Sequence, residues 1–209
     1  MKCLGQIKWA FFFFLYIIVF PTHAQVEFHY GPRIGLGLST FMGPDANGTN
    51  SPTGTLVGLY TQTKFSKKIS VDAELNYISM GSLFSVNRGT PEERNFKVAL
   101  GYISLPINFN YCVYKRIHAQ VGIQTSAILT GNLEMKYQGV LTKNETISPY
   151  QSIDAGPTVG CYYQFEKGLQ VGVRCYRGLV NIFKQDYQIY NSGIQLLITY
   201  QFSRAVKEL

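Results

Sequence analysis

Apolar and polar residues alternate with a period of two along most of the chain, which is typical of β-strands with one apolar and one polar face. In residues 103–113 every odd position is apolar, and every even position is Ser, Pro, Asn or Cys. Residues 69–79 and 119–129 follow the same rule, and the remaining stretches follow it less cleanly. The alternation predicts eight strands, at residues 30–40, 55–65, 69–79, 103–113, 119–129, 153–165, 169–176 and 193–202.

The lengths of the strands and of their connections distinguish between two all-β architectures. Strands of soluble sandwiches usually run about five or six residues, whereas a tilted membrane strand needs about nine to eleven. The connections are alternately long and short, as in membrane barrels, where tight turns lie on the periplasmic side and long loops outside. We therefore predict an eight-stranded antiparallel up-and-down transmembrane β-barrel. The short connections are 66–68, 114–116 and 166–168, and the long ones are 41–53, 82–96, 130–150 and 178–189.

In such a barrel the apolar face of each strand meets lipid and the polar face lines the lumen. The chain contains 20 glycines, and glycines on the polar face fit a narrow barrel with little room for side chains. A soluble lipocalin-like carrier is the alternative for the same strands, and it would place the apolar face inside. Aromatic residues near strand ends are expected to form the interfacial girdles: Tyr30, Phe65, Tyr77, Tyr111, Tyr163, Tyr200 and Phe202.

The N-terminal segment has the three parts of a secretory signal peptide. Lys2 and Lys8 give a positive start, residues 10–20 form an apolar run, and small residues precede the end at Ala24. We predict that residues 1–24 are removed, which leaves residues 25–209 as a single barrel domain. An exported barrel of this kind belongs in the outer membrane of a bacterial cell envelope, with outer-membrane lipid as its surroundings.

The formal net charge of +7 raises the question of a nucleic-acid partner. Lysine and arginine are scattered over turns and loops, and the protein is expected to be exported, so no nucleic-acid partner is predicted. The basic pairs Lys67–Lys68 and Lys115–Arg116 fall in predicted short turns. They are interpreted as solvated turn residues, with attraction to lipid headgroups as the alternative.

Cysteines and histidines give little sign of chemistry. Cys112, Cys161 and Cys175 remain after removal of the leader, an odd number without metal-type spacing. Free buried thiols are expected, and a Cys161–Cys175 disulfide between neighbouring strands is the alternative. His29 and His118 both fall near the periplasmic end, away from the outer rim where a lipid-modifying hydrolase would need a Ser–His pair. We expect no enzyme, cofactor or metal.

Five charged residues fall on the predicted lumen face: Arg33, Asp72, Glu74, Asp154 and Arg174. Buried charges persist only when they are paired, so the two arginines are predicted to pair with acidic residues among the three. An eight-stranded barrel is just wide enough to be filled by side chains, and the preferred interpretation is a salt-bridged plug that closes the lumen. A gated polar pathway and carboxylates that perform acid–base chemistry are the alternatives.

Several motifs occur in a characteristic order: a leader ending at Ala24, then GPRIGLGLS (31–39), ELNY (74–77), YISLPI (102–107), DAGPTVG (154–160), RCYRGLVNI (174–182) and a last strand ending in YQF (200–202). In these the chain resembles the PorT-like small outer-membrane β-barrel proteins of Bacteroidetes. The resemblance implies an outer-membrane protein, sometimes linked to secretion or gliding motility, with no established catalytic residues.

The sequence thus predicts a non-enzymatic, monomeric barrel with a side-chain-filled lumen, which acts as a structural or interaction protein. Its external loops would contact other envelope proteins. A porin-like channel for small solutes is the first alternative, and a lipid- or glycan-active barrel enzyme is the second.

Overall fold

The protein is described by a computed structural model that covers residues 27–44, 46, 49–50, 52–87, 89–138, 140–146, 152–181 and 188–204. The predicted signal peptide, residues 1–24, lies outside the described residues, as does its cleavage site. In these described segments, no helix has the length and apolar character needed to cross a membrane.

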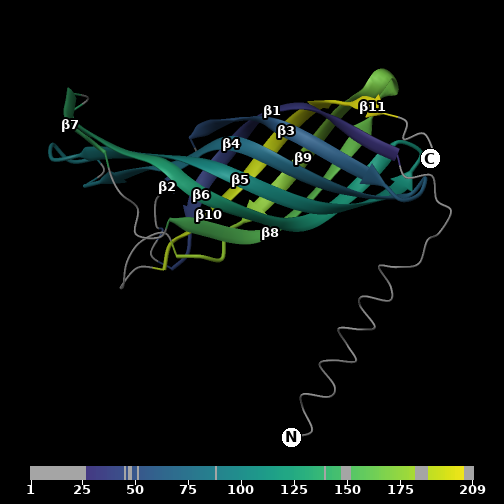
Figure 1. The fold of residues 1–209 in the computed structure, drawn as a ribbon. Coiled ribbons are helices and arrows are strands. Elements are labelled where there is room, and N and C mark those ends of the chain that lie inside the picture. Colours follow the sequence, from purple (N-terminus) through teal and green to yellow (C-terminus); the bar gives the residue numbers. More distant parts are fainter. Residues whose placement is uncertain are drawn as a thin grey trace, which may run out of the picture.

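The described strands form one antiparallel sheet that closes on itself (Figure 1). Hydrogen-bonded neighbours follow the order β10-β9-β8-β6-β5-β4-β3-β1-β11, and β10 also pairs with β1, which closes the ring. β11 continues β10 beyond Gln201 and pairs with the start of β1, so the ring has eight positions, as predicted. The strands of the ring are β1 (Glu27–Met42), β3 (Thr53–Lys64), β4 (Ile69–Val86), β5 (Arg94–Tyr114), β6 (Ile117–Tyr137), β8 (Ile153–Gln164), β9 (Leu169–Arg177), β10 (Tyr190–Tyr200) and β11 (Phe202–Arg204).

Three short elements lie outside this path. β2 (Thr49–Asn50) pairs with β4, and β7 (Val140–Thr146) pairs with β6. The 3-10 turn η1 (Glu166–Gly168) joins β8 to β9. The other short turns connect β3 to β4 and β5 to β6 at the same end of the barrel, which we call the turn end (Figure 1).

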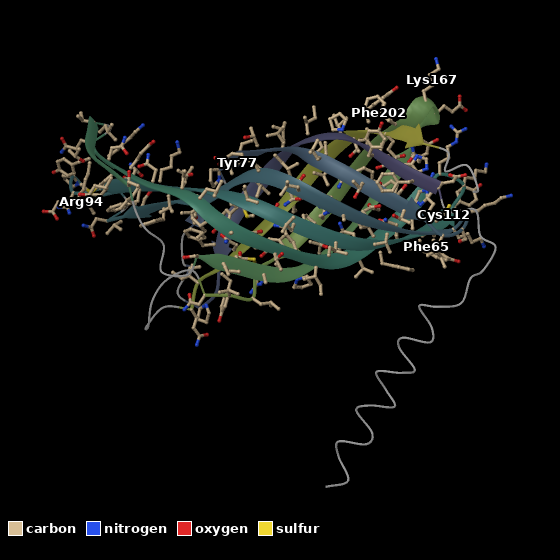
Figure 2. The ribbon with its side chains drawn as sticks, in the orientation of Figure 1. Phe65, Tyr77, Arg94, Cys112, Lys167 and Phe202 are labelled. Atoms are coloured by element: carbon tan, nitrogen blue, oxygen red, sulfur yellow. The ribbon has the colours of Figure 1, made fainter. Side chains whose placement is uncertain are left out.

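The two faces of the wall follow the predicted alternation. Leu105 and Ile107 are 51% and 60% exposed, whereas their neighbour Asn108 is fully buried in the lumen. This is the reverse of a lipocalin, because the apolar residues form the outer surface. The predicted girdle aromatics are all exposed, with Phe65 and Phe202 at the turn end and Tyr77 farther along the barrel (Figure 2).

The prediction for the cysteines was partly wrong. Cys112, Cys161 and Cys175 are free, as expected, and the disulfide does not form. However, Cys161 and Cys175 are exposed rather than buried. Their positions alternate with the inward residues Gly160 and Arg174, so the thiols lie on the outer, lipid-facing surface.

Two of the predicted long loops consist largely of strand. β4 and β5 stay paired out to Val86 and Arg94, and β6 runs to Tyr137 before the chain turns into β7. β3 pairs with β4 only as far as Ile78, and β8 pairs with β6 only as far as Ala127. Beyond these points the sheet leaves the ring and projects from the barrel (Figure 1). We call this projection the arm: residues 82–86, 94–98, 132–137 and 140–146.

The sequence pattern predicted a polar inner face along the whole barrel, and this prediction holds only for part of it. Toward the arm the inward residues become apolar, beginning with Ile78 and Met80 on β4, and they form a buried cluster that fills this end of the lumen. The chain therefore has a polar lumen in the middle and an apolar closure on the arm side. The members of the apolar cluster are Phe41, Leu56, Ile78, Met80, Val98, Leu100, Tyr102, Tyr176 and Leu197.

Candidate functional site in the polar lumen

The candidate site is a group of charged side chains at mid-height in the lumen. Arg33 comes from β1, Asp72 and Glu74 from β4, and Arg174 from β9, and each is at most 4% exposed. They meet because inward positions recur every second residue and the barrel is narrow enough for opposite walls to touch.

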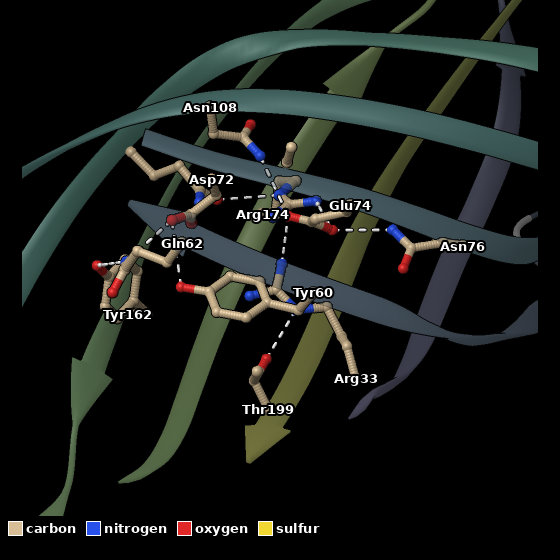
Figure 3. A network of polar contacts seen from close by, with 12 residues as sticks. Arg33, Tyr60, Gln62, Asp72, Glu74, Asn76, Asn108, Tyr162, Arg174 and Thr199 are labelled. Carbon is tan, nitrogen blue, oxygen red and sulfur yellow. Dashed lines mark hydrogen bonds and ion pairs between the residues drawn. The ribbon is translucent and has the colours of Figure 1, made fainter. Parts of the chain in front are cut away.

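Glu74 is the centre of this group (Figure 3). Arg174 holds its carboxylate with two hydrogen bonds, from Nη2 to Oε1 at 2.5 Å and from Nη1 to Oε2 at 3.1 Å. Arg33 donates to Oε1 from Nη1, while Asn76 and Asn108 donate to the two oxygens at 2.8 and 3.1 Å. One carboxylate therefore compensates two buried guanidinium groups, and all of its acceptor capacity is used.

Both arginines are also fixed by neutral partners. The Arg33 Nε donates to Thr199 Oγ1 at 2.7 Å, and its guanidinium carbon lies 4.3 Å from the centre of the Tyr60 ring. The Arg174 Nε donates to Gln120 Oε1 at 3.0 Å. The network thus connects seven strands across the lumen: β1, β3, β4, β5, β6, β9 and β10.

Asp72 lies one inward position closer to the turn end and is bound differently. Its carboxylate accepts hydrogen bonds from Gln62 at 2.9 Å, Gln120 at 3.1 Å and the Tyr60 hydroxyl at 3.2 Å. Among the described residues it forms no ion pair within 4.0 Å, so its carboxyl group is held by neutral donors rather than by a direct salt bridge.

Asp154 is not part of this group. It lies beside the apolar cluster, where Asn191 donates to its Oδ2 at 2.7 Å and also to the Tyr102 hydroxyl at 2.9 Å. In the described part of the chain no arginine pairs with it, and of the three acids among which partners for Arg33 and Arg174 were predicted, Glu74 is the one that forms the ion pairs. Sequence reasoning also missed the neutral members of the network, although their inward positions in the alternation identify them as lumen residues: Tyr60, Gln62, Asn76, Asn108, Gln120 and Thr199.

The space left around the network is small. The void beside Arg33 and Arg174 measures about 10 Å³, enough for about one water molecule. Nowhere in the described ranges do three His, Cys, Asp or Glu side chains come together to hold a metal ion. The geometry therefore favours a structural network that holds the walls together.

Comparison with known proteins gives the same architecture. The sequence model of a family described as "Outer membrane protein beta-barrel domain" matches residues 23–184. Among solved structures, Ail, the attachment invasion locus protein of Yersinia pestis, is similar with a TM-score of 0.50 and 12% identity, over 84% of this chain and 99% of Ail. Neisserial surface protein A is similar with a TM-score of 0.46 and 11% identity, over 84% and 97% of the two chains. No curated protein matches the sequence.

The family match covers more than half of the chain, and the fold shared with Ail is a small membrane barrel. The protein is accordingly located in the outer membrane, with the apolar outer surface of the ring in lipid. The chain belongs to the outer membrane protein beta-barrel domain family.

Proposed function

We propose that this protein is a non-conducting membrane anchor that presents its arm to other molecules outside the cell. The observation that carries the proposal is the lumen, which is crossed at mid-height by the Glu74 network and filled on the arm side by the apolar cluster. A barrel closed in this way has its accessible features at its two ends.

The arm supports the second half of the proposal. Loops are sufficient to close the lumen of a membrane barrel. Here three strands of the wall, β4, β5 and β6, continue beyond the ring as an extension of the same sheet. Every described side chain of β7 is exposed, and a hollow of about 370 Å³ on the arm is lined by Phe84, Phe96, Lys97 and Glu134 among others. Such a sheet offers both side chains and a strand edge to a partner.

The alternatives have less support. A porin-like channel needs a continuous water path, and the void at the network is about one water in size. A lipid- or glycan-active enzyme at the outer rim would need a catalytic base there. Both histidines of the described chain lie at the turn end, where His29 contacts Glu27 at 3.3 Å and His118 stacks on Tyr162 at 4.6 Å.

We also infer that the chain is a PorT-like member of this family and that it acts as a monomer in secretion or motility. The motif series from residue 31 to residue 202 supports this finer placement. Ail, which shares the fold, is named as an attachment invasion protein, and contact through an external surface is the kind of role that the arm would serve.

Planar-bilayer recordings test the closed lumen. The refolded full-length mature chain is expected to give no stable conductance steps, because the network and the apolar cluster leave no path for ions. The triple variant Arg33→Ala, Glu74→Ala, Arg174→Ala removes the network but leaves the apolar cluster, so it should also give no stable steps. A porin recorded in the same bilayers shows that the assay can detect an open lumen. Stable ion-selective pores from the unaltered protein would replace the anchor with the channel.

A further inference from the structure

A hollow of about 540 Å³ lies at the turn end of the barrel, opposite the arm. Its charged side chains and its one histidine come from β1, from the end of β3, from the turn before β4, and from the β5–β6 hairpin. We call it the turn-end vestibule, and these lining residues are Glu27, Lys64, Lys67, Lys68, Lys115 and His118.

The vestibule has an excess of positive charge. Four ammonium groups face one carboxylate, and that carboxylate, Glu27, is 4.0 Å from Lys64. Lys67, Lys68 and Lys115 form no ion pair with any residue that the structure describes. The neighbouring turn differs, because Arg116 donates to Glu166 at 2.6 Å and thereby lowers the pKa of the Glu166 carboxyl.

The vestibule ends blindly toward the lumen. Ser70 is 5% exposed and accepts a hydrogen bond from Asn110 at 3.3 Å. His118 stacks in parallel on Tyr162, whose hydroxyl accepts a hydrogen bond from Gln62 at 3.2 Å. An anion that enters the vestibule therefore meets packed side chains on the lumen side.

The rim of the vestibule reaches the membrane interface. Phe65 and Ile69 line the hollow, and they are also 46% and 37% exposed. Tyr111 and Tyr114 on β5 are exposed at the same end. Exposed aromatic side chains of a membrane protein lie at the depth of the lipid headgroups, so the four lysines lie close to a layer of phosphate groups.

We propose that the turn-end vestibule binds the phosphate headgroup of an anionic phospholipid from the adjoining leaflet. Lysines bind phosphate as point charges, and a concave site with low-dielectric walls concentrates the positive potential. The lipid tail would remain outside the barrel, along the apolar surface next to Phe65 and Ile69. The proposal is independent of the anchor role, since the vestibule and the arm are at opposite ends.

Native mass spectrometry of the full-length mature chain in maltoside micelles tests the proposal. Short-chain phosphatidylglycerol is expected to bind more tightly than phosphatidylcholine, which has no net charge. Each lysine near an anionic headgroup strengthens binding. Lys68→Gln should therefore weaken phosphatidylglycerol binding about fivefold. Lys115→Gln, which changes a different turn, should have an effect of about the same size.

Lys167→Gln is the matched control. Lys167 is a turn lysine at the same end of the barrel but does not line the vestibule, so binding should change less than about twofold (Figure 2). Equal losses for Lys68→Gln and Lys167→Gln, or equal binding of the two lipids, would overturn the proposal in favour of general surface attraction. Displacement of the lipid by inorganic phosphate at constant ionic strength would overturn the lipid assignment in favour of a soluble phosphate. A heat-modifiability gel verifies that each variant folds.

Discussion

At the scale of single residues, Glu74 is the residue that binds both buried arginines of the lumen. Two guanidinium groups removed from water would be costly alone, and here both are bound to the same carboxylate. Glu74 depends on the arginines in turn, because a buried carboxylate with fewer hydrogen-bond donors would be poorly stabilised. The three charges therefore depend on one another, and removal of one leaves the others uncompensated.

Replacement of Glu74 by Ala is expected to destabilise the barrel by about 3–5 kcal/mol, since it leaves two buried cations without a counter-charge. Arg174→Ala alone should also lower the free energy of unfolding. The double variant should lose less stability than the sum of the two single variants. Urea unfolding in lipid vesicles, analysed as a double-mutant cycle, measures this difference. Asp154→Asn is the matched acid for the control cycle, because Asp154 lies apart from Arg174. The changes in unfolding free energy caused by Asp154→Asn and Arg174→Ala should add to within about 0.5 kcal/mol. If the changes caused by Glu74→Ala and Arg174→Ala were also additive, the network would be contradicted.

The sequence could identify the lumen residues but not their partners. Alternation alone places Arg33, Glu74, Asp154 and Arg174 on the inner face. Which of them meet depends on the tilt and stagger of the strands, and these are set by the register of every pair in the ring. Asp154 pairs across β6 with Ser126, at the level of Asn76 rather than of Glu74, and it is therefore placed beside the apolar cluster.

At the scale of strands, the sequence predicted the membrane-embedded part well and the arm poorly. In lipid the outer face must be apolar, so a strand such as 103–113 has a clean pattern. Outside lipid both faces of a sheet can be exposed to solvent. Residues 94–97 and 134–137 consequently mix Arg, Lys and Glu with aromatic residues and Met, and this mixture is typical of a loop. The arm could only be recognised from the strand pairing.

Close approach of neighbouring strands explains one glycine on the inner face. A Cβ at Gly122 would lie 2.3 Å from the Ile107 carbonyl oxygen and 2.5 Å from Asn108 Oδ1, whereas a Cβ at Gly37 would come no closer than 3.6 Å to any such atom. Gly122→Ala should therefore lower the midpoint of urea unfolding, because the β5 backbone has to move, while Gly37→Ala should leave the midpoint nearly unchanged. Equal effects of the two substitutions would show that glycine content, and not local space, determines stability here.

At the scale of the whole molecule, the barrel has two different ends joined by a closed interior. The turn end combines short turns, exposed aromatic side chains and an excess of lysine, whereas the other end carries the apolar cluster and the arm. Between them the Glu74 network connects opposite walls (Figure 3). The network and the apolar cluster lie between the two ends, and the void beside Arg33 and Arg174 has room for about one water molecule.

The orientation of the barrel decides which compartment each end meets. In membrane barrels the short turns lie in the periplasm and the long connections outside, so the arm should face the exterior and the vestibule the inner leaflet. In a background without the native cysteines, Asn144→Cys on β7 should react with a membrane-impermeant maleimide on intact cells. Lys67→Cys, in the turn before β4, should react only after the envelope is permeabilised. Both positions are solvated, so a difference in labelling reports the side of the membrane and not burial in the protein. Labelling of Lys67→Cys on intact cells with protection of Asn144→Cys would reverse the orientation, and the arm could then no longer be the external contact surface.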